Sequence, residues 1–260
     1  MLFRYWKIWL RLTASAFQVA LISRFGAILF TLGKILRFIF FLMVLYMIVT
    51  KTNTLAGYTL TQTFVFYLTF NLIDTLTQLL FRDVYRFRFL IVSGDFDLIL
   101  IKPINPLFRI LLGGADPMDL LISIPYIILL IIFLLKVKFT FIALLTYVLL
   151  IVNGMFISTA FHIFVLALGI LTTEIDHVIM IYRDISEMVR FPLDIYREPL
   201  RGLITFVIPV GIMMSFPPKA LFGSLSVPLI LIAFVIGILF LILSYRLWRF
   251  ALSKYTSASS

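Results

Sequence analysis

Four polar residues recur on one face of an otherwise apolar stretch. Tyr67, Asn71, Asp74 and Gln78 are spaced by four, three and four positions, which places them on one side of an α-helix. A charged group at the middle of a bilayer costs about 2.5–3.5 kcal/mol on insertion scales, so this stripe should face protein or water. A substrate path would use such groups, and His162, expected at a similar depth, could pair with Asp74. Hydrogen bonds that only hold helices together explain the same pattern, and the residues alone leave both interpretations open.

Enzymatic chemistry has little support in this sequence. The two histidines, His162 and His177, belong to no HExxH zinc motif, and no GxSxG sequence presents a nucleophilic serine. Gly33 and Lys34 lack the earlier glycine and the following Ser or Thr of a phosphate-binding loop. The chain has no cysteine, which excludes thiol catalysis, disulfides and cysteine-ligated metals. We therefore expect no catalytic site, no metal site and no cofactor bound by this chain.

The composition places the polar stripe in a membrane protein. Of the 260 residues, 63% are hydrophobic and 13% are charged, whereas soluble domains are about 45–50% apolar and about 25% charged. A spanning helix needs about 20 mostly apolar residues. Six spans are expected, at Ile28–Val49, Leu60–Leu80, Leu120–Leu135, Phe139–Leu171, Leu203–Phe216 and Val227–Trp248. The fifth is short and contains Pro209, so a broken or re-entrant helix is an alternative there. We predict an all-α integral membrane protein with one transmembrane domain over residues 1–260.

Basic residues predict the orientation of these spans. Most of the 22 lysines and arginines precede the first span, follow the last, or lie in residues 81–119 and 172–202. Because basic residues collect on the cytoplasmic side, both termini and both of these segments are expected in the cytoplasm. Residues 1–27 combine tryptophans with basic residues on one helical face, which is typical of a helix in the membrane interface; these basic residues are Arg4, Lys7 and Arg11. Every basic segment adjoins the membrane, so we expect contacts with lipids and none with nucleic acid.

The segment between the second and third expected spans contains a short motif. A glycine break at Gly94 separates two short apolar helices, and Pro103 ends the second. This stretch resembles the cytoplasmic loop of type-2 ABC-transporter permeases, in a bacterial branch with the signature Gly-x-x-Asp-x-x-Leu-x-(Lys/Arg)-Pro. The matching positions are Gly94, Asp97, Leu100, Lys102 and Pro103. Residues 191–218, with their recurrent prolines, look like the segment of that branch that enters the fifth span, and the resemblance covers nearly the whole chain.

The resemblance implies a permease subunit of an ATP-driven exporter in a bacterial-type cell membrane. Such permeases work with a second, identical or related permease and with two copies of a separate P-loop ATPase, which binds ATP and Mg²⁺. Residues 81–119 would then be the coupling segment that contacts the ATPase, and residues 172–202 a second cytoplasmic segment. The residues expected to couple are Arg88, Gly94, Asp95, Asp97, Lys102 and Pro103. The polar stripe and His162 would line the substrate path, and hydrophobic or cationic compounds are the substrates usually suggested for this branch.

Two other functions remain open at this point. An ion- or proton-coupled secondary transporter could use Asp74 and His162 as a proton relay, although the inverted repeats expected of such a protein are not visible. An intramembrane enzyme would need clustered acid–base or metal groups, and the best set, near His177, has no recognisable ligand spacing. A P-loop ATPase that co-purifies with the chain would favour the permease.

Overall fold

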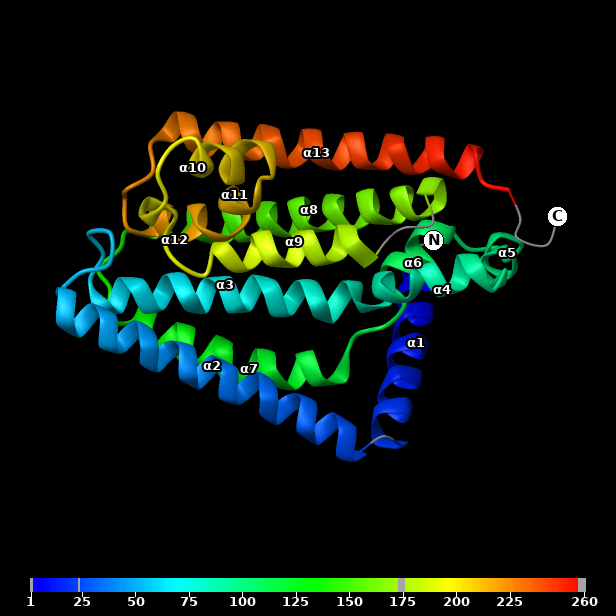
Figure 1. The fold of residues 1–260 in the computed structure, drawn as a ribbon, viewed down its shortest axis with the longest axis horizontal. Coiled ribbons are helices and arrows are strands. Elements are labelled where there is room, and N and C mark those ends of the chain that lie inside the picture. Colours follow the sequence, from blue (N-terminus) through cyan, green and yellow to red (C-terminus); the bar gives the residue numbers. More distant parts are fainter. Residues whose placement is uncertain (1, 23, 173–175, 257–260) are drawn as a thin grey trace.

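The computed structural model describes residues 2–22, 24–172 and 176–256, and these are helical throughout apart from turns and loops, with no extended strand among them. Five helices are long and apolar enough to cross a membrane, and they lie side by side along the length of the molecule (Figure 1). They are α2 (Arg24–Thr52), α3 (Leu60–Phe81), α7 (Pro117–Leu134), α8 (Phe141–Thr172) and α13 (Val227–Ser253). The all-α membrane fold predicted from the sequence is therefore confirmed, and five of the six predicted spans match these helices closely.

The fifth predicted span, Leu203–Phe216, was wrong as a continuous helix. It is divided into α10 (Leu200–Gly202), a π-helical turn over Leu203–Val207, α11 (Val210–Met214) and α12 (Phe216–Leu221). Pro209 cannot donate a backbone hydrogen bond, and Ile208 before it leaves the helical conformation at φ −113° and ψ 83°. The alternative of a broken helix is the one that the structure adopts.

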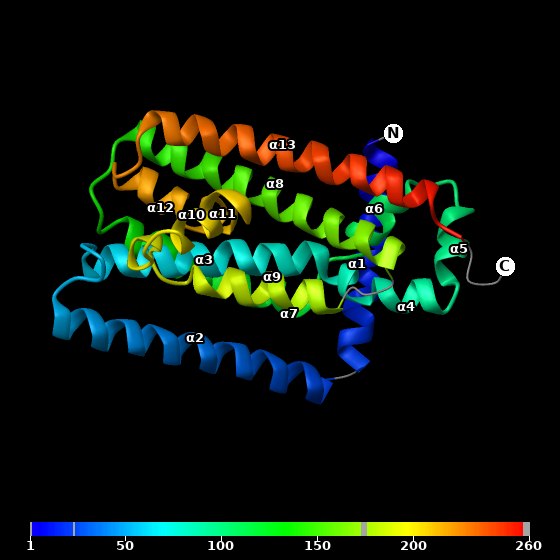
Figure 2. The same cartoon turned by 45° about the horizontal axis from the view of Figure 1, so that its top comes forward.

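Residues 176–202, within the segment 172–202 that was expected in the cytoplasm, include a helix that packs against the bundle. They supply α9 (Asp176–Met188), which runs along the bundle beside α8 and α3 (Figures 1 and 2). Tyr182 of α9 is buried, and its ring stacks on that of Phe161 of α8 at a centroid distance of 4.3 Å. The chain then turns at the opposite end of the bundle, where Arg201 and Lys219 line one small cavity. Arg201, which belongs to the segment 172–202 expected in the cytoplasm, therefore lies at the end of the bundle away from α4 and α5 (Figure 1).

The segment between α3 and α7 forms the predicted pair of short helices. A 3-10 turn over Arg82–Arg86 leads into α4 (Phe87–Val92), α5 (Asp95–Leu100) and α6 (Pro106–Leu111). Gly94, between α4 and α5, has φ +78°, a conformation that other residues rarely adopt. The glycine break read from the sequence thus has a backbone reason.

Helix α1 (Leu2–Ile22) lies crosswise at the end of the bundle that also holds α4, α5 and the end of α13 (Figures 1 and 2). It is tied to the segment between α3 and α7 by three hydrogen bonds. Arg4 Nη2 donates to the carbonyl of Pro103 at 3.1 Å, the backbone N–H of Asn105 donates to the Tyr5 hydroxyl at 3.3 Å, and that of Ala115 donates to Thr13 Oγ1 at 3.0 Å.

Candidate functional site

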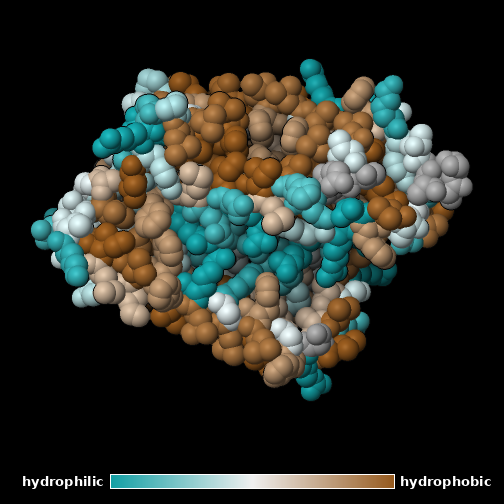
Figure 3. Space-filling view, in the orientation of Figure 1, coloured by the Kyte–Doolittle hydropathy of each residue, from teal (hydrophilic) through white to brown (hydrophobic). Residues whose placement is uncertain are grey.

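A polar cavity of about 440 Å³ opens among α2, α3, α7 and α9. Figure 3 shows hydrophilic surface in the middle of this face of the molecule, flanked by hydrophobic surface. The cavity is lined by Leu29, Phe30, Gly33, Lys34, Arg37, Phe38, Tyr67, Asn71, Asp74, Thr75, Gln78, Arg82, Tyr126, Arg183 and Arg190. Charged side chains at the depth of the membrane-spanning helices are costly against lipid, so this face must be covered by protein or water.

The stripe predicted on α3 lies along this cavity. Tyr67, Asn71, Asp74 and Gln78 all contribute to the lining. The amide of Asn71 donates to the carbonyl of Tyr67 at 2.7 Å, and Gln78 Nε2 donates to Asp74 Oδ2 at 2.8 Å. The helical spacing therefore placed these four side chains correctly on one face. Their role in a substrate path stays a prediction.

His162, which was predicted to line the substrate path with these residues, lies outside the cavity. Its ring is buried and its Nδ1 is 2.8 Å from the carbonyl oxygen of Ser158, one turn earlier in α8. It packs against Phe81 at a centroid distance of 4.9 Å and against Tyr182 at 5.5 Å. Within the described residues, His162 and Asp74 form no hydrogen bond or ion pair, and His162 does not line the cavity. The structure thus gives the polar stripe and His162 separate surroundings.

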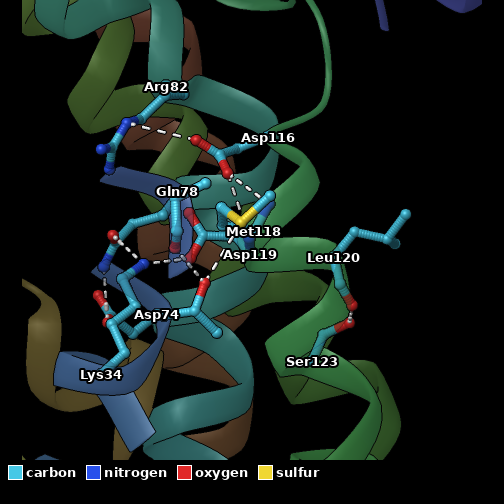
Figure 4. A network of polar contacts seen from close by, with 11 residues as sticks. Lys34, Asp74, Gln78, Arg82, Asp116, Met118, Asp119, Leu120 and Ser123 are labelled. Carbon is cyan, nitrogen blue, oxygen red and sulfur yellow. Dashed lines mark hydrogen bonds and ion pairs between the residues drawn. The ribbon is translucent and has the colours of Figure 1, made fainter. Parts of the chain in front are cut away.

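A buried ion pair closes one side of the cavity (Figure 4). Lys34 of α2 binds the carboxylate of Asp119, in the first turn of α7, and its Nζ lies 3.4 Å from Gln78 Oε1. The side chain of Asp119 is 1% exposed. Its second oxygen, Oδ2, has no hydrogen-bond partner in the part of the chain that the structure describes. Asp119 was not among the predicted site residues, and the signal for it in the sequence was its position three residues after Asp116, in the first turn of a helix that starts at Pro117.

The start of α7 also positions the side chain of Arg82, which lines the cavity. Asp116 caps the helix, because its carboxylate accepts from the backbone N–H groups of Met118 at 2.8 Å and Asp119 at 3.2 Å. Its other oxygen lies 3.6 Å from Nε of Arg82, whose guanidinium stands over the ring of Phe30 at 5.4 Å. One capping residue thus positions both Asp119 and Arg82.

The other side of the cavity is built by arginines of α2 and of the region around α9. Arg37 and Arg190 share one carboxylate, that of Glu187, at 3.1 Å and 2.5 Å. Arg190 also stands over the rings of Phe41 and Phe70, at 5.4 and 5.7 Å. Arg183 is exposed to the cavity and forms no ion pair with any residue that the structure describes. Arg183 and Arg190 were missed as site residues because the helix α9 was not predicted from the sequence.

The residues predicted to couple to an ATPase lie at the end of the bundle, around α4 and α5. Arg88, Lys102 and Pro103 are exposed. Arg88 Nη1 forms an ion pair with Asp176 at the start of α9, at 2.7 Å. Asp95 accepts a hydrogen bond from Ser93 at 2.8 Å beside the Gly94 turn.

Beneath this surface, α4 and α5 are anchored to α13 and the residues after it. Phe87 and Phe96 are fully buried, and their ring centroids are 5.2 Å apart. Phe87 contacts Trp248 at 6.3 Å, and Phe96 contacts Tyr255 at 4.9 Å. Burial and the nearby carboxylate of Asp97 raise the pKa of Tyr255 to about 12. A force on α4 and α5 would therefore reach α13 directly.

The residues that the structure describes contain no group of three or more His, Cys, Asp or Glu side chains that could hold a metal ion.

Comparison with known proteins agrees with these features. The family model described as ABC-2 family transporter protein matches residues 35–259, which include every long helix from α3 onwards and most of α2. Searches of curated proteins and of solved structures gave no match. Because the family match covers most of the chain and agrees with the helical membrane fold, this protein belongs to the ABC-2 family of transporter proteins and is an ABC-transporter permease.

Proposed function

We propose that this chain is the membrane subunit of an ATP-driven exporter whose ATP hydrolysis takes place on a separate ATPase subunit. Two ATPase copies would bind ATP and Mg²⁺, and a second permease, identical or related, would complete the path. Both termini and the α4–α5 end would lie in the cytoplasm of the cell that carries it. The family match and the distribution of basic residues support this arrangement.

The observation that favours coupling is the surface of the α4–α5 hairpin. Its inner residues are packed into the core, whereas apolar residues on the outside remain uncovered. Phe89 is 69% exposed and Ile101 is 78% exposed, with Lys102 beside it. Exposed apolar residues beside charged ones, on a rigid support, are typical of a protein docking surface. The hairpin would pass ATPase closure to α13 through Trp248 and Tyr255.

The substrate path would run along the polar cavity. Because the cavity opens on a face flanked by hydrophobic surface (Figure 3), a second permease facing it would enclose a polar route through the membrane. Changes in the packing of α2 and α9 on either side would then open or close that route, driven by the ATPase.

The test of coupling is purification of the native complex through a tag on this chain. We expect Lys102→Glu and Asp97→Arg to reduce the amount of ATPase subunit that co-purifies, or to uncouple its hydrolysis from export. Lys136→Glu, an exposed lysine at the opposite end of the bundle, is the matched control and should leave both unchanged. Equal ATPase recovery and equal export-linked hydrolysis in all variants would contradict the proposed contact.

A further inference from the structure

We propose that the polar cavity binds an anionic group, of the phosphate or carboxylate type, and that this group belongs to the exported substrate. The second half of this statement rests on the proposed exporter function, whereas binding of the anion does not.

The charged side chains in and around the cavity favour binding of an anion. Five basic side chains line it, and one carboxylate, that of Asp74, does so. Three further carboxylates pair with the basic groups from the cavity's edge: Asp119 with Lys34, Asp116 with Arg82, and Glu187 with two arginines. The cluster therefore holds one more cation than it holds carboxylates, even when every carboxylate is ionised.

The excess positive charge lies on arginine side chains that a ligand in the cavity can contact. Arg37 and Arg190 both depend on Glu187, and the side chain of Arg37 is 55% exposed. Arg183 faces the same cavity with no ion pair to any described residue. Guanidinium groups present several donors in a planar fork that matches phosphate and carboxylate oxygens. An anion entering here would gain donors that the protein leaves partly unused.

The surroundings favour the charged end of a larger, partly apolar molecule. Leu29, Phe30 and Phe38 of α2 form an apolar wall of the cavity, and Tyr126 of α7 adds an aromatic ring. The volume of about 440 Å³ is at the small end of the range for ligand pockets, about 300–1,000 Å³. The cavity therefore suits an anionic headgroup whose apolar part extends along α2. This differs from the cationic or hydrophobic compounds suggested by the resemblance.

A single introduced cysteine can report occupancy, because the chain has none. Gly33 lines the cavity and has open space around the position of a Cβ, so Gly33→Cys should fold normally. The full chain would be purified in a neutral detergent and its alkylation by a maleimide timed. The probes are dioctanoyl phosphatidate, the uncharged dioctanoylglycerol with the same chains, and inorganic phosphate. Lys138→Cys, in the exposed loop before α8, controls for effects on the reagent.

We expect phosphatidate to slow alkylation at position 33 and not at position 138, and the glyceride to have little effect. Adding Arg183→Gln should weaken this protection by about tenfold, as expected for loss of a hydrogen bond to a charged group. Arg197→Gln, an exposed arginine outside the cavity, should not change it. Equal protection by inorganic phosphate would support the anion site and assign it to a water-soluble anion.

Equal protection by the uncharged glyceride, no protection by either anion, or no effect of Arg183→Gln would overturn the proposal. This assay needs no ATPase, so its failure would leave the coupling experiment untouched. Conversely, anion binding together with unchanged ATPase recovery and unchanged export-linked hydrolysis in the Lys102 and Asp97 variants would refute the proposed coupling and keep the anion site.

Discussion

Replacing Lys34 with methionine should destabilise the bundle far more than removing the charge of its partner Asp119. Among the described residues, Lys34 is the only group that forms an ion pair or hydrogen bond with the carboxylate of Asp119, since Oδ2 has no partner and the side chain is 1% exposed. Breaking a buried pair so that one charge stays uncompensated costs about 3–5 kcal/mol. The side chain of Lys34 is 23% exposed and also contacts Gln78 and the ring of Phe30, so Asp119→Asn should cost about 1–2 kcal/mol.

The assay is unfolding in mixed micelles of rising SDS content, followed by the fluorescence of the tryptophans, of which Trp248 is buried. The decisive sample is the double variant Lys34→Met with Asp119→Asn, which contains no uncompensated charge. It should be more stable than Lys34→Met alone. If the two single variants lose the same free energy of unfolding, or if the double variant loses their sum, the two side chains are not coupled and the reasoning is refuted.

Three other predictions follow from the fold and the site. Gly237→Val should lower the free energy of unfolding by about 1–3 kcal/mol, because a side chain there meets an asparagine side chain of α8; Gly33→Ala, in open space, should leave stability unchanged. Asp74→Asn should reduce export while complex yield and basal ATP hydrolysis persist; equal export, or loss of the complex, would return Asp74 to a structural role. In intact cells, an impermeant thiol reagent should modify Thr52→Cys and not Ser257→Cys, and the reverse pattern would invert the proposed orientation.

The long helices were predictable because about 20 consecutive apolar residues are stable only when they face lipid or a protein core. The bounds expected for the second span, Leu60–Leu80, differ from those of α3 by one residue at one end. The glycine turn at Gly94 was also readable, since a local backbone requirement determines it. These features depend on residues close together in the sequence.

Only the α3 side of the cavity could be predicted from the sequence. The α3 stripe follows from helical spacing, whereas the pairing of Lys34 with Asp119 joins residues far apart and needs the packed structure. Helix α9 was missed for a physical reason: polar residues such as Arg183 and Glu187 lower its mean hydropathy, because that side faces the cavity or its rim. A hydropathy criterion finds helices that are surrounded by lipid or by an apolar core, and one side of α9 has neither around it.

The crosswise helix α1 connects the segment around Pro103 to α2. Its 21 residues make a rigid rod of roughly 30 Å. The rod is attached near its start to the chain around Pro103 and at its middle, through Thr13, to Ala115, and α2 follows it in the sequence. A displacement of about 3 Å at the fastened end would swing such a rod through about 6°. The helix moved at the far end is the one that supplies Lys34 and Arg37. A movement of the segment around Pro103 that tilted α1 would then shift the basic side chains of α2, although that segment does not line the cavity.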